Sequence, residues 1–174
     1  MAAYVLSGLS KEHVMQLNKR QFLSFCSAGA AAFVLGCGRD ATAKTRFAVT
    51  YSDAEWKKRL SPAAYRILRQ EDTERPYSSR LNSEKRKGVY VCAGCNKRLF
   101  SSVTKFESGT GWPSFFTPLA GGIGTKTDYK IGLPRTEVHC AQCGGHLGHV
   151  FDDGPKPTGK RYCMNGAAMK FLPG

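Results

Sequence analysis

The chain has 174 residues, a length that suggests one domain, and its 26 Lys and Arg against 13 Asp and Glu give a formal net charge of +13. A basic balance attracts anions and nucleic acid, but these charges are scattered and the densest run, "SEKRKG", is short, so a solvated surface is favoured over a nucleic-acid patch. Two C-x-x-C pairs account for four of the seven cysteines, which favours metal ligation over a disulfide framework.

The N-terminal part, residues 1–43, has the features of a targeting segment. Lys19 and Arg20 precede an apolar run from Phe22 to Cys37, which is short for a membrane span of ~20 residues and typical of an export signal. The stretch "KRQFL" also resembles a twin-arginine signal, with Lys in place of the first Arg. "VLGC" resembles a lipobox that would place a lipid anchor on Cys37. The small residues "ATA" at 41–43 instead favour cleavage just before Lys44.

Met15 would give a more typical signal length than Met1. The resulting expectation is an exported protein, either periplasmic or a membrane-anchored lipoprotein, with residues 44–174 as the functional domain. Two alternatives stay open at this point. The segment is an organelle-targeting sequence, since Ser and basic residues also suit a transit peptide, or it is an apolar helix that packs on the domain.

Two short helices are expected to open the domain. In "SDAEWKKRL", Ser52 and Glu55 have the capping-box spacing that satisfies the free amides of a helix start. In "SPAAYRILRQ", Ser61 is a second cap and Pro62 takes the first helical position. The stretch that follows, "TERPYSSRLNSEKRKG", is expected to be a polar loop.

The remaining pattern indicates short strands. "GVYVC", "KRLF", "TEVHC", "GHVF", "RYCMN" and "AMKF" are short apolar or alternating runs bounded by Gly, Pro, Asn or Asp. The sequence therefore predicts a small, mostly antiparallel β domain with helices at its N-terminal edge.

A zinc site is predicted from the two cysteine pairs, Cys92 with Cys95 and Cys140 with Cys143. Each pair follows a strand-like run and closes a tight turn, and four thiolates suit one tetrahedral Zn²⁺, which is structural because zinc has no redox chemistry. Redox-active C-x-x-C motifs or disulfides are the rival interpretations, but a redox motif would be expected in a βαβ context.

Two further stretches carry functional groups. In "ESGTGWPSFF" a Gly-Pro turn presents Trp112, for which core filling is the alternative role. In "GGHLGHVFDDGP", His146 and His149 are three residues apart and Asp153 follows. The four cysteines already complete a metal shell, so acid–base work is favoured for these histidines.

The last cysteine, Cys163, has no C-x-x-C partner and lies between Arg161 and Asn165. A lone cysteine is often an inert buried residue. Here the arginine is expected to lower the pKa of the thiol and favour thiolate. A cysteine with histidines elsewhere in the chain is a candidate nucleophile.

These stretches together, from about Phe47 to Phe171, resemble the B-type methionine sulfoxide reductase family. The resemblance implies two small antiparallel β-sheets and reduction of the R epimer of methionine sulfoxide, free or in proteins, as oxidative-damage repair. By position, Cys163 matches the family nucleophile and the paired cysteines match its structural zinc ligands. The residues that match those shaping the active site are Trp112, His146, His149, Asp153, Arg161 and Asn165.

The implied mechanism is attack of the Cys163 thiolate on the sulfoxide sulfur, which leaves a sulfenic acid. His149 is the first choice of proton donor, with His146 assisting, and Trp112 offers an aromatic face to the substrate methyl group. Many family members carry a resolving cysteine where this chain has Thr110. The expectation is therefore a one-cysteine enzyme, regenerated by thioredoxin, glutaredoxin or a small thiol, unless Cys37 survives and resolves the sulfenic acid.

Two other functions compete with the reductase. A basic zinc-ribbon module would bind nucleic acid, but it explains neither the lone cysteine nor the G-W-P and H-x-x-H stretches, so no nucleic-acid partner is expected. A thiol–disulfide exchange protein would need a metal-free C-x-x-C pair. A monomer is the default expectation.

Overall fold

The computed structural model describes residues 47–174. The expectations for residues 1–43, including a start at Met15 and a lipid anchor at Cys37, lie outside the described residues. Within residues 47–174, no helix has the length and apolar character needed to cross a membrane.

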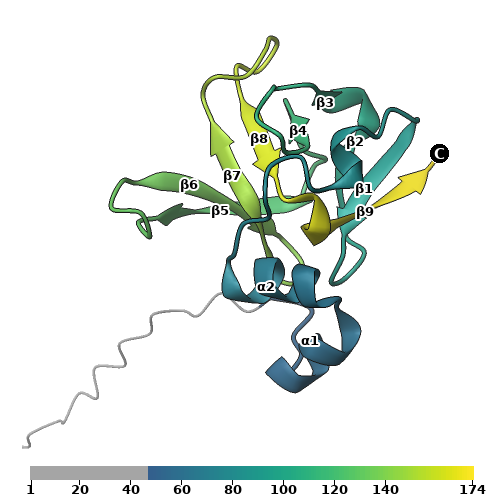
Figure 1. Ribbon diagram of the computed structural model, residues 1–174, viewed down its shortest axis with the longest axis vertical. Helices are drawn as coiled ribbons and strands as arrows, with labels where there is room; N and C mark the ends of the chain where they lie inside the picture. Colours follow the sequence, from purple (N-terminus) through teal and green to yellow (C-terminus); the bar gives the residue numbers. More distant parts are fainter. Residues whose placement is uncertain (1–46) are drawn as a thin grey trace, which may run out of the picture. The chain divides into compact units, whose positions relative to one another are not determined.

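Two short helices open the described part of the chain, as expected from the caps: α1 (Asp53–Arg59) and α2 (Pro62–Gln70). The Ser52 hydroxyl accepts the amide of Glu55 while the Glu55 carboxylate accepts the amide of Ser52, which completes a capping box. Ser61 caps α2, with Pro62 at its first position. The inner face of α2 is buried, so this helix closes one end of the β domain (Figure 1).

The β domain consists of two antiparallel sheets, which confirms the expected fold class. The three-stranded sheet has the order β2-β1-β9, and the six-stranded sheet has the order β3-β4-β8-β7-β6-β5. The strands are β1 (Gly88–Cys92), β2 (Arg98–Ser101), β3 (Lys105–Phe106), β4 (Ser114–Phe115), β5 (Ile123–Asp128), β6 (Arg135–Cys140), β7 (His146–Phe151), β8 (Arg161–Met164) and β9 (Met169–Pro173). Short 3₁₀ turns lie at η1 (Arg80–Asn82), η2 (Ser102–Thr104) and η3 (Gly166–Ala168).

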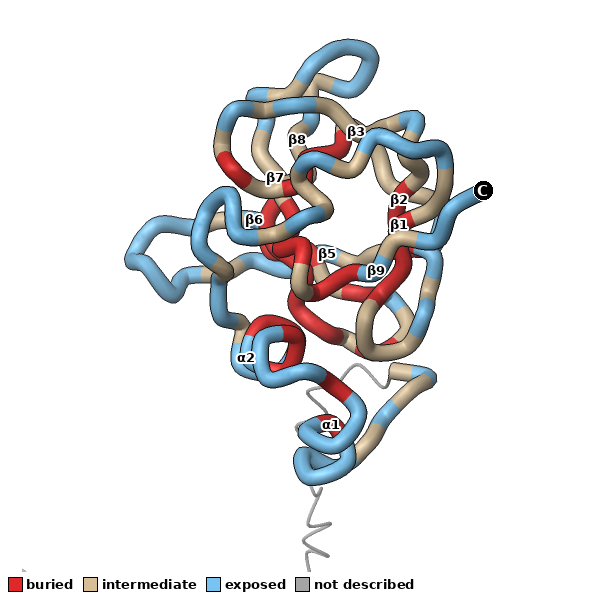
Figure 2. Tube along the Cα trace, turned by 45° about the vertical axis from the view of Figure 1, so that its right-hand side comes forward, coloured by how far each residue is buried: buried red, intermediate tan, exposed pale blue. Residues whose placement is uncertain are grey.

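A core of buried aromatic side chains joins the two sheets. Phe100 of β2 stacks on Phe115 of β4 with ring centroids 4.3 Å apart, and Tyr90 of β1 meets Phe115 edge-on at 4.8 Å. Figure 2 shows buried residues concentrated where the sheets and α2 meet, whereas the tip of the β5–β6 hairpin is exposed. The core therefore fixes β4, which in turn pairs with β8.

Candidate active site

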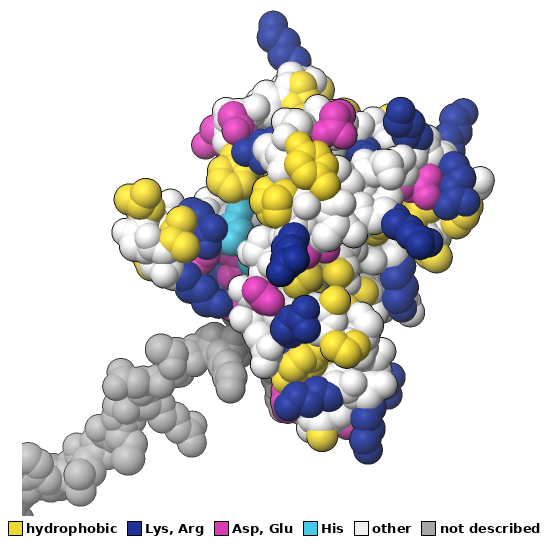
Figure 3. Space-filling view, in the orientation of Figure 1, with side chains coloured by type: hydrophobic (Ala, Val, Ile, Leu, Met, Phe, Trp, Pro, Cys, Tyr) yellow, Lys and Arg dark blue, Asp and Glu magenta, His cyan; other side chains and the backbone are white. Residues whose placement is uncertain are grey.

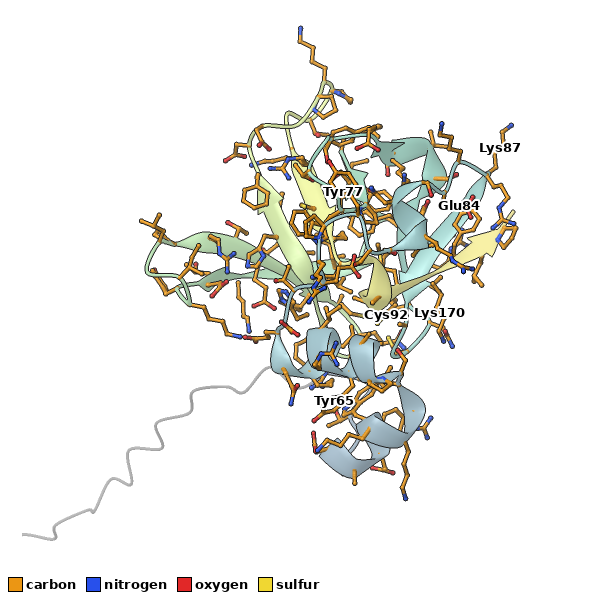
Figure 4. All side chains as sticks on the ribbon, viewed as in Figure 1. Tyr65, Tyr77, Glu84, Lys87, Cys92 and Lys170 are labelled. Atoms are coloured by element: carbon orange, nitrogen blue, oxygen red, sulfur yellow. The ribbon has the colours of Figure 1, made fainter. Side chains whose placement is uncertain are left out.

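The four paired cysteines come together at the turns after β1 and β6. Their ligand atoms all lie within 4.8 Å of one another, with 3.7 Å between the sulfurs of Cys92 and Cys143 and 3.5 Å between those of Cys95 and Cys140. Zn–S bonds of ~2.3 Å in a tetrahedron place sulfurs about 3.8 Å apart, so the cluster fits one zinc ion. Cys92 is labelled in Figure 4.

The chemistry of the donors also favours a cation in this cluster. Contact with the Cys140 sulfur raises the pKa of both Cys92 and Cys143. Four thiolates can therefore share this space only when a positive ion neutralises them. Each turn belongs to a different sheet, so a bound zinc ion would fasten the two sheets together.

The lone Cys163 lies away from this cluster, in the centre of the six-stranded sheet. It pairs with His149 on β7 and with Ser114 on β4, and His149 pairs in turn with Glu137 on β6. Residues directly opposite in an antiparallel sheet share a face. The register therefore places Glu137, His149, Cys163 and Ser114 in one row on the same face.

A β-bulge explains how two histidines three residues apart can lie on this face. In a regular strand an odd separation points side chains to opposite faces. Here Val138 pairs with Gly148 but His139 pairs with His146, so Leu147 is an extra residue in β7. As a result the rings of His146 and His149 meet edge-on, with centroids 5.4 Å apart.

A small cavity of about 150 Å³ opens above Cys163. Its lining combines the lone thiol, an imidazole and two aromatic rings: Thr73, Trp112, Arg135, Gly148, His149, Phe151, Cys163 and Asn165. On this face, a histidine reaches the surface near the β5–β6 hairpin, beside hydrophobic and basic side chains (Figure 3). A larger groove of about 590 Å³ lies beside α2, but neither cysteine nor histidine lines it, so the chemistry points to the smaller cavity.

Gly148 permits the close approach of β7 to β8 beneath the cavity. A Cβ atom at this position would lie 2.1 Å from the carbonyl oxygen of Cys163 and 3.0 Å from the Cα atom of Met164. Any side chain here would separate the two strands. The glycine between the histidines is thus required by packing against the strand that carries the thiol.

His149 is held by residues that the sequence analysis did not single out. Its Nε2 atom lies 2.8 Å from a carboxylate oxygen of Asp128, and the same oxygen accepts a hydrogen bond of 2.6 Å from Arg135. Burial lowers the pKa of His149 even though the Asp128 carboxylate acts in the opposite direction. A neutral His149 therefore donates Nε2–H to Asp128 and leaves Nδ1 free of a proton.

His146 does not line the cavity. It is 3% exposed, and its Nδ1 atom lies 2.9 Å from the carboxylate of Glu137, which is also 3% exposed and pairs with Lys126 at 2.9 Å. This buried pair supports the ring of His149 from behind. The structure thus separates the two histidines into one at the cavity and one beneath it.

Arg161 and Asp153 form an ion pair at the edge of the site. The guanidinium donates two hydrogen bonds to the carboxylate, of 2.9 and 2.8 Å, and its carbon lies 4.5 Å from the ring centre of Phe151. Burial raises the pKa of the Cys163 thiol, and Thr110, Arg161 and Ser114 only partly offset it. Arg161 lowers the pKa of this thiol, as expected from the sequence, but burial outweighs it and the net shift is upward.

The polar loop after α2 contributes one side of the cavity. The carbonyl of Glu74 accepts the indole N–H of Trp112 at 3.1 Å, and its amide donates to the side-chain oxygen of Asn165 at 3.0 Å. Tyr77, labelled in Figure 4, donates from its hydroxyl to the carbonyl of Gly109 and from its amide to that of Gly111. This loop thereby holds the turn that presents Trp112.

Of the residues predicted for the site, the structure brings four into the cavity lining: Trp112, His149, Cys163 and Asn165. Residues that sequence reasoning missed are Glu74, Asp128, Arg135, Glu137 and Phe151. A weak signal existed for Arg135 and Glu137, since both stand at alternate positions of a strand-like run. No local signal marked Glu74, because its partners are about ninety residues away.

Comparison with known proteins supports the resemblance found in the sequence. Residues 60–173 match the SelR domain family. The chain is 55% identical over 126 residues, 72% of its length and 96% of the relative's, to "Peptide methionine sulfoxide reductase MsrB" of Leptospira interrogans. It is 55% identical over 125 residues, 71% of its length and 88% of the relative's, to the protein of the same name from Methanosarcina barkeri.

A plant protein, "Peptide methionine sulfoxide reductase B1, chloroplastic" of Arabidopsis thaliana, is 55% identical over 129 residues, 74% of this chain and 63% of the relative. The family match covers more than half of the chain and the bacterial and archaeal relatives are spanned almost completely. The chain therefore belongs to the B-type methionine-R-sulfoxide reductase family, whose members are oxidoreductases that reduce methionine sulfoxide.

Proposed function

We propose that this protein reduces the R epimer of methionine sulfoxide with Cys163 as the nucleophile. The observation that carries the proposal is the position of this sulfur. It lies in a small cavity beside His149 and Trp112, away from the four cysteines that suit a structural zinc ion. The Trp112 ring provides an apolar wall for the substrate methyl group, and Arg135, His149 and Asn165 are polar groups of the same lining.

In the first step the Cys163 sulfur bonds to the sulfoxide sulfur. This S–S bond then breaks together with the S–O bond of the substrate, as the oxygen passes to the cysteine sulfur. Burial keeps Cys163 as a thiol and His149 as a neutral imidazole at rest. His149 takes the thiol proton and delivers it to the sulfoxide oxygen, so that no external proton is consumed. The products are methionine and a Cys163 sulfenic acid, with the oxygen and its proton both on the cysteine.

An external thiol then restores Cys163. It attacks the sulfenic acid sulfur, releases water and forms a mixed disulfide, which a second thiol reduces. Among residues 47–174 the other cysteines belong to the metal cluster, and the hydroxyl oxygen of Thr110 lies 3.8 Å from the Cys163 sulfur. Thioredoxin, glutaredoxin or a small thiol is the proposed reductant, and oxidised proteins or peptides are the proposed substrates.

The test is an assay of the full chain with separated R and S epimers of a methionine sulfoxide peptide and dithiothreitol. Cys163→Ser is expected to abolish turnover, and a double Cys26→Ser, Cys37→Ser variant is expected to retain it. Turnover of the S epimer, or a Cys37–Cys163 disulfide found by mass spectrometry in the oxidised protein, would contradict the proposal.

A further inference from the structure

Three hydroxyl groups form a continuous hydrogen-bonded chain that ends on the Cys163 sulfur. The Oγ1 atom of Thr110 lies 3.8 Å from this sulfur and 2.8 Å from the hydroxyl of Ser108. The hydroxyl of Ser108 lies 2.7 Å from that of Ser114, which lies 3.1 Å from the carbonyl oxygen of Trp112. The chain thus runs from the thiol to a backbone acceptor through four links.

Counting protons fixes the direction of this chain when Cys163 is protonated. A hydroxyl has one proton to donate and can accept two hydrogen bonds, whereas a carbonyl oxygen only accepts. Ser114 therefore donates to the Trp112 carbonyl, Ser108 to Ser114, and Thr110 to Ser108. The Cys163 S–H then donates to Thr110, so that four protons fill four links and all point away from the sulfur.

Loss of the thiol proton leaves three protons for the same four links. The sulfur is now an acceptor, and each hydroxyl can turn about its C–O bond. If all three turn, Thr110 donates to the thiolate, Ser108 to Thr110, and Ser114 to Ser108. The link that is given up is the one to the Trp112 carbonyl, which at 3.1 Å is the longest of the oxygen–oxygen links.

We propose that this hydroxyl chain reverses its direction when Cys163 ionises, and that Thr110 is a catalytic residue that stabilises the thiolate. Ser108 is a positioning residue that acts through Thr110, and Ser114 continues the chain to the Trp112 carbonyl. Only the thiol proton leaves, because the reversal itself is a rotation of three O–H bonds. The proposal rests on the proposed function only in taking Cys163 as the nucleophile.

Burial makes such a donor valuable at this position. Burial raises the pKa of Cys163, and the Thr110 hydroxyl is the largest of the influences that lower it, ahead of Arg161 and Ser114. Ser114 is fully buried, so water cannot substitute for its hydroxyl. Aligned hydrogen bonds in a chain also polarise one another, which strengthens the bond at its end.

The other groups around the sulfur come from three strands. Arg161 lies on β8 itself and is paired with Asp153, His149 comes from β7, and Arg135 from β6. Asp128 holds both His149 and Arg135. The substitutions below leave all of these groups in place, so their effects report on the hydroxyl chain.

The test measures the pH dependence of Cys163 alkylation by iodoacetamide in the full chain, with the Cys163 peptide resolved by mass spectrometry. Thr110→Val keeps the shape of the side chain but removes its hydroxyl. It should raise the pH midpoint of Cys163 alkylation by about one unit, which corresponds to a tenfold lower thiolate fraction at any pH below the midpoint. Thr110→Ser should restore the wild-type midpoint to within about 0.3 units, less than a twofold change in thiolate fraction.

Ser108→Ala tests the chain as opposed to a single donor. It removes the middle hydroxyl without touching the sulfur, and the midpoint should rise by about half as much as in Thr110→Val. Thr125→Val, at an exposed position of β5, is the matched control and should change nothing. Zinc content and circular dichroism show whether each variant is folded.

An unchanged alkylation midpoint in Thr110→Val would overturn the whole proposal. An unchanged midpoint in Ser108→Ala alone would show that Thr110 acts as a single donor and not as the end of a chain. The alkylation assay does not depend on turnover. If the wild-type enzyme failed to reduce methionine sulfoxide while the midpoints moved as expected, the proposed function would fall and the hydroxyl chain would stand.

Discussion

Replacing Glu74 with alanine should loosen the turn that follows Cys163. The Glu74 carboxylate accepts the amides of Gly166 at 2.6 Å and Ala167 at 2.8 Å, whereas the local N-cap of η3, Asn165, makes no capping bond with its side chain. Hydrogen bonds to a charged group contribute about 1.5–3 kcal/mol each. Water replaces part of this because Glu74 is only partly buried, so we expect Glu74→Ala to lower the free energy of unfolding by about 2 kcal/mol.

The loss corresponds to a fall of roughly 8 °C in Tm for a domain of this size. Urea unfolding followed by tryptophan fluorescence at equal zinc content measures it. Asp152→Ala is the control, since this carboxylate is 84% exposed in its ion pair with Lys160 and should cost less than about 0.5 kcal/mol. Equal unfolding midpoints for Glu74→Ala and wild type would refute the claim that the loop caps the turn after the nucleophile.

Glu74 also touches the cavity through its backbone, and this predicts a kinetic effect separate from stability. Its carbonyl and amide hold Trp112 and Asn165 whatever side chain is present. A looser loop should therefore weaken substrate binding more than it slows chemistry, raising KM more than it lowers kcat. A fall in kcat at constant KM, measured well below Tm, would show instead that the turn acts on Cys163 directly.

Three further outcomes are expected. Removing the metal with a chelator should greatly lower the unfolding free energy and release about one zinc ion per chain, and an unchanged urea midpoint would contradict a structural role. Lys130 and Lys126 lower the pKa of Glu71 from 4.5 to about 2. The contribution of the ionised Glu71 carboxylate to folding stability is therefore complete above pH about 4.5 and is lost as the pH falls through about 2. The stability difference between wild type and Glu71→Gln should follow that course, and a constant difference would count against the ion pairs. Thr110→Cys should form a disulfide with Cys163 on oxidation, because Oγ1 and Sγ are 3.8 Å apart, and peptide mapping would detect it or rule it out.

Local sequence rules predicted the parts of the fold that depend on neighbours in the chain. The helix starts followed from Ser52, Glu55, Ser61 and Pro62, because capping uses side chains within one turn. Most strands followed from alternating or apolar runs. β5 was missed because "IGTKTD" is largely polar and exposed, and it forms a strand through its pairing with β6.

The site was predictable only where its residues carry their own chemistry. Cys163 and His149 were candidates from the sequence because thiols and imidazoles are recognisable at any position, and the structure places both in one cavity lining. Glu74 and Asp128 were not, since a carboxylate in a polar stretch usually faces water, and their roles depend on which strands and loops the fold places beside them. The lowering of the Cys163 pKa by Arg161 was predicted, but the larger opposing effect of burial was not, because burial is a property of the packed sheet.

The bulge at Leu147 links the spacing of the two histidines to the shape of β7. At the present spacing of three residues, a regular strand without the bulge would point His146 and His149 to opposite faces, and either the buried pair of His146 with Glu137 or the placement of His149 beside Cys163 would be lost. Deleting Leu147 together with the bulge would instead leave the two histidines two residues apart on one face. One extra residue is therefore accommodated only because the bulge absorbs it, and a further single insertion between the histidines would turn one of them to the other face.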